Sequence, residues 1–579
     1  MKPTRRQLLG TALAGSLAAC SPSPKIQSFK ASSDTASGLF AHGIASGDPL
    51  TDAVVIWTRL TPDNPNDGPV ELTWEMDQSP NFKTVSASGK VTASAATNWT
   101  AKVDVRGLEP GRWYYYRFSV DIYTSPIGQT RTLPEGDINQ ARFAVVSCAN
   151  WQHGFFNTYD HIARQNRKTR QFDALIHLGD YLYEYGADKI FGTDYAKMGR
   201  LHEPRHEIIT LNDYRTRHAQ YRTDPSLQAL TAKMPMICIW DDHESSNDSW
   251  VTGAENHNEN EGDWENRKAA ALRAYYEWMP IREPQAGKPR EAIFRKFEWG
   301  NLLTLVALET RLMARSESYI FDPYFEMISE PGGAEKFKTE ILGDPARQML
   351  GDAQLDFLID SLTSSKEAGK PWRLVANQIP MAKINTPDLT PHVNEEAMLN
   401  IEKVWSGIRE FVELSRHTLP MYPDAWDGYP AARNRLYARL KEADVTDMLV
   451  LTGDAHEFWA NDLTDDNGTQ MGVEIGTSSV SSETLAAFLK DSSEDYGLLM
   501  TQSNPDVRYY NLLTQGYIDL TIKSDRAEAK MIAIDNVITQ EYDAFETAAF
   551  TIRPTKSTLK LSTPKGLNMK QRALFTGLG

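Results

Sequence analysis

The sequence predicts an α/β (α+β) fold, in which a layered sandwich of sheets and helices follows an N-terminal β-sandwich module. Three observations lead to this prediction. The chain of 579 residues is too long for one simple domain, so two or three are expected. Residues 38–137 carry short alternating apolar runs and no helical stretch. From about residue 138 to 550, strand-like and helix-like patterns alternate, which is typical of helices packed on sheets.

Composition and charge are those of an ordinary globular protein. Lys and Arg total 61 and Asp and Glu total 77, which gives a formal net charge of −16. Nucleic acid is therefore not expected as a partner, because phosphate backbones are bound by basic surfaces. The three cysteines, Cys20, Cys148 and Cys238, indicate no disulfide framework.

The first twenty residues are predicted to be an export signal. Thr4–Leu9 contains the two adjacent arginines of a twin-arginine signal, and the apolar run that follows is too short for a stable membrane span. The run ends in Leu17–Cys20, which resembles a lipoprotein processing site. We expect the twin-arginine export machinery to carry the chain to the periplasm or cell envelope, with membrane contact only through a lipid on Cys20. An ordinary signal peptide with a chance cysteine is the alternative. Residues 21–37, rich in Ser, Pro, Lys and Ala, are predicted to be a linker.

Residues 38–137 are predicted to form a β-sandwich of short strands. Apolar residues alternate in five runs, and a Gly- and Pro-containing turn at 107–111 leads into an aromatic alternation. That turn and the run after it resemble a fibronectin-type module. No cluster of ligand side chains lies in this region, so its expected role is structural, or to shape the rim of the neighbouring site. The predicted strands are Ala53–Leu60, Val70–Met76, Val85–Ala93, Thr100–Val105 and Arg112–Phe118.

In the second region, six apolar runs each stop at a polar side chain or at a turn that carries one. Helical patterns such as Asn266–Trp278 and Ala353–Leu362 lie between them. Because open α/β sheets bind ligands beyond the carboxyl ends of their strands, six such endings predict one site along the edge of a sheet. The endings are Cys148 after Phe143–Ser147, Asp180 after Ala174–Leu178, Asp242 after Met236–Trp240, Glu309 after Leu302–Leu308, Asn377 after Leu374–Ala376, and Asp454 and His456 after Leu449–Leu451.

The residue types at these endings are those of metal ligands. A thiolate, a carboxylate, a phenolate and an imidazole together suit ferric iron, and hard carboxylate oxygens suit calcium. Asp180 serves both sets if it bridges two metals, and Tyr183, three residues later, is spaced to return toward it. Paired metals are a common device for cleaving phosphate esters through a metal-bound hydroxide. The iron set is Cys148, Asp180, Tyr183 and His456, and the calcium set is Asp180, Asp242 and Asp454.

The order of these blocks resembles the PhoD-type alkaline phosphatases, from about residue 38 to 545. The matching blocks are Val146–Ala149, Leu178–Glu184, Trp240–Glu244, Gly262–Trp264, Glu277–Pro280, Asp424–Pro430 and Leu451–His456. The resemblance implies a metallophosphoesterase-like sandwich over residues 138–550, an Fe³⁺–Ca²⁺ centre, and hydrolysis of phosphate monoesters or diesters. A phospholipase D-like phosphodiesterase of the same family is the alternative.

The resemblance also assigns residues. It implies that Cys148, Asp180 and Tyr183 bind iron. The common phosphoesterase pattern has Asn-His where this chain has Asp242-His243, and His-x-His where it has Asp454-x-His456. Both exchanges replace a neutral ligand by a carboxylate, which favours calcium. This chain also has Glu309 where relatives often have Asp, which puts the geometry there in doubt.

Several residues retain alternative interpretations. His243 is expected to contact the phosphoryl oxygens or the leaving group, and Asn377 is a candidate metal-shell or phosphate contact; a buried core position is the alternative for each. Cys148 alone would more often be a small buried hydrophobe. Asn247 and Asp248 could extend the calcium site, whereas Asp424 and Asp427 are expected to hold an aromatic turn. Residues 551–579 are predicted to be a solvated tail, with a lid over the site as the alternative.

Two function classes other than a phosphoesterase are alternatives. An envelope binding protein would use its metal only structurally, in a coordinatively closed site. A metallopeptidase is disfavoured because the chain has no His-Glu-x-x-His helix.

Overall fold

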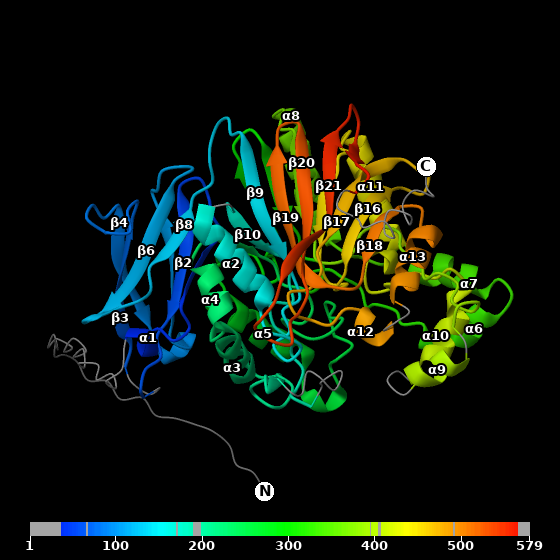
Figure 1. The fold of residues 1–579 in the computed structure, drawn as a ribbon, viewed down its shortest axis with the longest axis horizontal. Helices are drawn as coiled ribbons and strands as arrows, with labels where there is room; N and C mark the ends of the chain where they lie inside the picture. The colour runs from blue at the N-terminus through cyan, green and yellow to red at the C-terminus, as the bar shows by residue number, and fades with distance from the viewer. Residues whose placement is uncertain are drawn as a thin grey trace, which may run out of the picture.

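A computed structural model describes residues 36–64, 68–169, 172–188, 198–393, 395–402, 407–489 and 493–564 (Figure 1). The predicted signal, the predicted lipid attachment site Cys20 and almost all of the linker lie outside the described residues, as does the end of the predicted tail. Within the described residues, no helix combines the length and the apolar character that crossing a membrane requires.

Two large sheets pack face to face and form the centre of the molecule. The first has ten strands in the order β22 (Leu559–Leu561), β21 (Ala544–Pro554), β20 (Arg526–Ile534), β19 (Gln515–Lys523), β9 (Gln140–Val146), β10 (Ala174–His177), β11 (Met236–Cys238), β1 (Ile44–Gly47), β2 (Ala53–Arg59) and β5 (Thr100–Arg106). The second has seven, in the order β12 (Arg295–Trp299), β13 (Leu303–Ala307), β14 (Trp372–Ala376), β15 (Met448–Thr452), β17 (Gln470–Gly476), β16 (Phe458–Thr464) and β18 (Val507–Asn511).

Side chains along the central strands point alternately into the core between the sheets and outward against helices, so the molecule has four layers: helices, sheet, sheet, helices. Phe143 and Val145 of β9 point into the core between the sheets, whereas Ala144 and Val146 point outward against helices. β14 does the same, with Leu374 in the central core and neighbouring residues in the outer one. The outer face of the first sheet is covered by α2 (Asn157–Thr169), α3 (Leu211–Arg222), α4 (Pro225–Thr231) and α5 (Trp264–Trp278), and that of the second by α8 (Gly351–Glu367), α10 (Ile408–Ser415) and α11 (Pro430–Glu442). The predicted layered α/β sandwich is therefore confirmed.

Helix starts follow local capping chemistry. Thr210 caps α3 in a capping box with Asp213, and Asp224 caps α4 just before Pro225. Asp263, in one of the blocks singled out above, caps α5 by accepting from the Asn266 amide. The shorter helices are α1 (Ala36–Leu39), α6 (Phe325–Ser329), α7 (Gly333–Lys336), α9 (Glu395–Glu402), α12 (Ala486–Leu489) and α13 (Ser493–Ser503). In Figure 1, α6, α7, α9 and α10 lie at the end of the molecule opposite the N-terminal strands.

The six predicted strand endings belong to two sheets, not one. β9, β10 and β11 run parallel in the ten-stranded sheet, and β13, β14 and β15 run parallel in the seven-stranded sheet. A bridge between Ser147 and Ser479 links the segments just after β9 and β17, one from each sheet. The site is thus built from the carboxyl ends of both sheets where they meet.

The N-terminal β-sandwich shares a sheet with the larger sandwich. Its second sheet contains β4 (Ala87–Ala93), β3 (Val70–Asp77), β6 (Trp113–Val120) and β7 (Tyr123–Thr124), with β8 (Gly128–Arg131) paired to β6. Its first sheet, β1–β2–β5, continues the ten-stranded sheet because β1 pairs parallel with β11. Asp48 reinforces the junction by accepting from Arg282 and Arg295.

Deleting the module should therefore prevent folding of the rest. A chain that begins at residue 138 would expose the edge of β11 and leave Arg295, which is mostly buried in the whole protein, without Asp48. We expect it to be recovered only as aggregate, measured as the soluble fraction after expression. A soluble, cooperatively unfolding chain from 138 onward would show that the module is an independent unit.

The C-terminal region differs from the prediction. The boundary placed at residue 550 falls inside β21, and β22 pairs with that strand. Ile552 and Leu559 are fully buried in the central core, so residues up to 561 complete the ten-stranded sheet and are not a solvated tail.

Candidate metal centre

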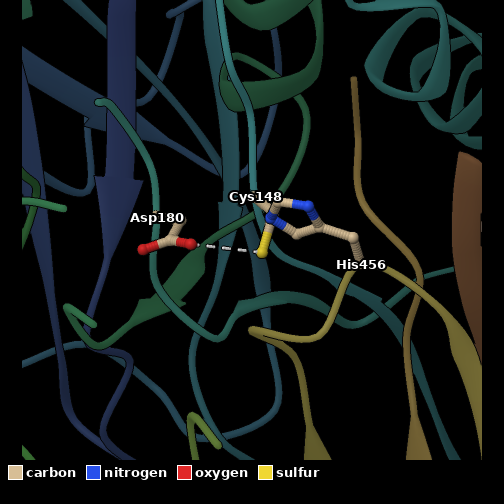
Figure 2. Close-up of side chains that lie close together, drawn as sticks. All are labelled: Cys148, Asp180 and His456. Atoms are coloured by element: carbon tan, nitrogen blue, oxygen red, sulfur yellow. Dashed lines mark hydrogen bonds between the residues drawn. The ribbon is translucent and has the colours of Figure 1, made fainter. Parts of the chain in front are cut away.

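The ends of β9, β10 and β15 bring three predicted ligands together (Figure 2). Cys148, Asp180 and His456 place one ligand atom each within 4.8 Å of the others. Together with Asp454, all three have positive φ angles: 61° at Cys148, 52° at Asp180, 63° at Asp454 and 62° at His456. Residues other than glycine rarely adopt this left-handed region, and such strain is found mainly at functional sites.

Gly179 explains how Asp180 reaches this position. Its φ of 110° suits glycine, and a Cβ at this residue would lie 2.5 Å from the Asp241 backbone nitrogen and Cβ. The Asp180 turn and the Asp241 turn therefore pack directly on each other. Glu244 fixes both, because its carboxylate accepts from the backbone amides of Asp180, Tyr181 and Asp241.

The first group of ligands surrounds one oxygen of Asp180. Its Oδ2 lies 3.4 Å from Cys148 Sγ and 3.2 Å from Tyr183 Oη. Tyr183 Oη is also 3.0 Å from His456 Nε2. The other nitrogen of His456 lies 2.8 Å from the backbone oxygen of Glu483, which orients Nε2 toward the group, as is usual for metal-binding histidines.

The protonation of this group depends on a cation. The pKa values of the Cys148 thiol and the Tyr183 phenol are raised well above their ordinary values. Burial is the larger cause and the neighbouring Asp180 carboxylate is the second. Burial lowers the pKa of His456 to about 3, so its imidazole is neutral and can coordinate. Thiolate and phenolate forms of Cys148 and Tyr183 would thus require a strong Lewis acid between them.

The second group consists of carboxylates beside the first. Three sets each bring their ligand atoms within 4.8 Å of one another. Asp180 Oδ1 and Asp241 Oδ2 are buried and have no hydrogen-bond partner among the described residues. Orphaned carboxylate oxygens that face other carboxylates fit a hard cation such as calcium. The sets are Asp180, Asp242 and His243; Asp241, Asp242 and Asp454; and Asp242, Asp248 and Asp424.

Comparison with known protein families identifies the chain at this point. The sequence model of the family described as PhoD-like phosphatase matches residues 143–531, and that of its N-terminal domain matches residues 25–134. The chain belongs to the PhoD-like phosphatase family. It is 34% identical over 499 residues to alkaline phosphatase D of Bacillus subtilis (strain 168), covering 83% of this chain and 75% of the relative. A solved structure of PhoD superposes with a TM-score of 0.74 at 28% identity, covering 94% of this chain and 98% of that one.

The PhoD-like site also contains a buried arginine that the sequence did not single out. Arg311 is fully buried, and its Nη2 donates to Asp454 Oδ1 at 3.0 Å. It also pairs with Asp241 and Asp424. Arg311 thus links three segments: the turn after β11, the turn after β15 and the aromatic turn at Asp424–Pro430. Asp424 does more than hold its turn, because it pairs with Arg311 and Arg315 and belongs to a carboxylate set.

Glu309, the departure from the common pattern, positions this arginine. Its carboxylate accepts from Trp240 Nε1 at 3.0 Å and from the backbone amides of Arg311, Leu312 and Met313 at 2.7–2.9 Å. The acid therefore closes the turn after β13, and its extra methylene lies outside the ligand sets.

His243 has a partner that the sequence analysis missed. Its Nδ1 lies 2.7 Å from Glu184 Oε2, and its ring contacts those of Tyr183 and Tyr185 at centroid distances of 4.1 and 5.4 Å. The backbone amide of Asn247 donates to the other Glu184 oxygen. Asn247 therefore supports Glu184, whereas Asp248 joins a carboxylate set. In the sequence, the position of Glu184 directly after Tyr183 and four residues after Asp180 could have indicated that it lies near the site.

The structure does not bring Asn377 to the ligand groups. Its amide nitrogen donates to the backbone oxygen of Ile379, and its Oδ1 accepts from Trp426 Nε1 at 3.3 Å. Asn377 is fully buried and holds the aromatic turn against β14, so the expected metal-shell or phosphate contact is replaced by a packing role. Asp427 pairs with Arg433 and holds the turn, and His177 contacts the Tyr159 hydroxyl inside the core.

Proposed function

We propose that this PhoD-like phosphatase hydrolyses phosphate monoesters and diesters at an iron–calcium centre. The observation that carries the proposal is the position of Asp180. One of its oxygens contacts the thiol and the phenol, and the other is buried without a hydrogen-bond partner among the described residues. Asp180 also belongs to a ligand set with Asp242 and His243. A bound pair of metals would supply an activated water and a positive clamp for phosphoryl charge.

Cys148, Tyr183, Asp180 and His456 would hold Fe³⁺, and Asp180, Asp242 and Asp454 would hold Ca²⁺. The donor chemistry supports this division, because thiol and phenol appear on one side of Asp180 only. Carboxylates outnumber the arginines that face them, so the second group retains negative charge for a divalent cation.

His243 would act on the substrate. Burial opposes its protonation, but Asp242, Glu184 and Asp180 outweigh burial and raise its pKa well above the ordinary value. A protonated imidazole held by Glu184 can donate a hydrogen bond to a phosphoryl oxygen or a proton to the leaving oxygen. The side chain is thus a general acid whose orientation is set by Glu184.

The attack on phosphorus is expected to be direct. Cys148 is an unsuitable nucleophile because burial and Asp180 raise the pKa of its thiol. Hydrolysis of a chiral phosphorothioate ester in isotopically labelled water should therefore invert the configuration at phosphorus. Net retention would mean a covalent phosphoenzyme and would overturn the direct path.

Export and anchoring remain part of the proposal. The arginine pair and the Leu17–Cys20 sequence support twin-arginine transport and a lipid on Cys20. The Cys20→Ser variant should be soluble in the periplasm and hydrolyse phosphate esters at an unchanged rate. Membrane fractionation measures its location. A wild-type protein already soluble after export would rule out the lipid.

A further inference from the structure

The junction between the N-terminal module and the larger sandwich encloses an arginine without a carboxylate. Arg222, the last residue of α3, is fully buried, and its guanidinium lies 4.7 Å from the ring centroid of Trp57 and 5.7 Å from that of Tyr181. Its Nη1 donates to Thr231 Oγ1 at 3.2 Å. Among the residues that the structure describes, no acid forms an ion pair with Arg222, and its Nε and Nη2 have no hydrogen-bond partner.

Unused polar groups gather around this guanidinium. The hydroxyls of Tyr181, Tyr116 and Ser46 are buried and make no hydrogen bond of normal geometry within the described part of the chain, nor does His218 Nδ1. Tyr181 lies beside Arg222, and Tyr116 lies beside Ser46. Tyr181 stacks on His218, one turn before Arg222 on α3, at 6.1 Å. The positive charge of Arg222 acts on the phenols of both Tyr116 and Tyr181. Clusters of unpaired buried polar groups are uncommon, because each is costly unless something binds them.

The surrounding groups do not balance the charge. Burial lowers the pKa of His42 and of His218 to about 3, so both imidazoles are neutral. The second cause is the charge of Arg59 for His42 and that of Arg222 for His218. Asp224, two residues along the chain, is occupied by Arg200 and by the amides that it caps. The C-terminal end of α3 contributes only a partial negative charge. A buried guanidinium in this setting requires a counter-ion.

We propose that the junction binds a small monovalent inorganic anion of the size of chloride, held by Arg222 and by the hydroxyls of Tyr181 and Tyr116. The enclosure favours this class over larger oxyanions, since Trp57, Tyr116 and Ser46 are fully buried. Tyr116, Ser46 and Trp57 belong to the module, whereas Arg222 and Tyr181 belong to the sandwich. The anion thereby joins the two parts of the molecule.

Crystals of the whole protein soaked in sodium bromide test the site directly. The proposal predicts an anomalous bromine peak in contact with Arg222 Nε or Nη2. An ordered water at that position, or no peak, would overturn it.

Thermal unfolding tests the same site in solution. The wild type should melt about 2 °C or more higher in sodium chloride than in sodium methanesulfonate at equal concentration, because an anion that binds only the folded state stabilises it. Arg222→Met should lose this difference. Arg373→Met is the matched control, because Arg373 is a buried arginine already paired with Asp447. Equal melting of the wild type in both salts would contradict the proposal, even if the Arg222 variant does not fold.

Discussion

Tyr183→Phe is expected to bleach the protein and to slow hydrolysis of phosphate esters by about 10³-fold, the scale on which catalytic electrostatic contacts are lost. Only the hydroxyl is removed, so the ring still packs on His243 at 4.1 Å while the contacts of Oη with Asp180 and His456 disappear. A phenolate bound to ferric iron absorbs visible light, so the visible spectrum of the purified variant measures the loss independently of activity.

Tyr185→Phe is the control for this change. Tyr185 also contacts the His243 ring, at a centroid distance of 5.4 Å, and no hydrogen bond from its hydroxyl to a ligand residue is seen in the described structure. The control should keep both colour and activity. A Tyr183→Phe protein with an unaltered visible band would show that this phenol does not bind the iron.

Arg311→Met should destabilise the fold by roughly 3–5 kcal/mol, as expected when one partner of a buried ion pair is removed. Burial opposes ionisation of Asp242, but Arg311 and His243 outweigh it and hold its pKa below the ordinary value. In the wild type this carboxylate stabilises the fold above the unfolded-state pKa of about 4, and the contribution is lost as pH falls through the folded pKa. The destabilisation by the variant should therefore be largest near neutral pH and shrink on acidification.

Urea unfolding of wild type and variant, with and without calcium, measures this effect. Calcium should raise the free energy of unfolding more in Arg311→Met than in the wild type. In the variant the carboxylates have lost the positive charge of the arginine, and bound calcium replaces it. Arg433→Met is the control, since Arg433 is a buried arginine paired with Asp427 in the aromatic turn. An equal calcium effect in all three proteins would show that Arg311 does not balance the carboxylate group.

Much of the site was predictable from strand endings. Cys148, Asp180 and His456 follow apolar runs that are typical of buried strands, and ligands gather at the carboxyl ends of such strands. The sequence did not show that β9 and β10 belong to one sheet and β15 to the other. The same rule misplaced Asn377, because a residue at a strand end can turn into the core as well as toward the ligand. One of its partners, Trp426, lies in the aromatic turn, whose packing no local pattern specifies.

The residues that sequence patterns missed act through tertiary contacts. Arg311 lies in a turn, where an arginine is usually solvated, and only the convergence of Asp241, Asp424 and Asp454 buries it. Four-residue β1 carries too short a pattern to reveal that it pairs with β11 and joins the module to the larger sheet. The sequence did not predict the end of β21 or β22, because exposed Arg553 and Lys560 mask the buried residues Phe550, Ile552 and Leu559.

Elemental analysis of the active mature protein, before and after treatment with a calcium-selective chelator, tests the proposed centre most directly. We predict stoichiometric iron that the chelator leaves in place, and calcium that is lost together with hydrolysis of phosphate monoesters and diesters. Calcium alone should restore both. Full activity of an iron-free, zinc-loaded protein, or restoration by zinc but not by calcium, would contradict the iron–calcium assignment.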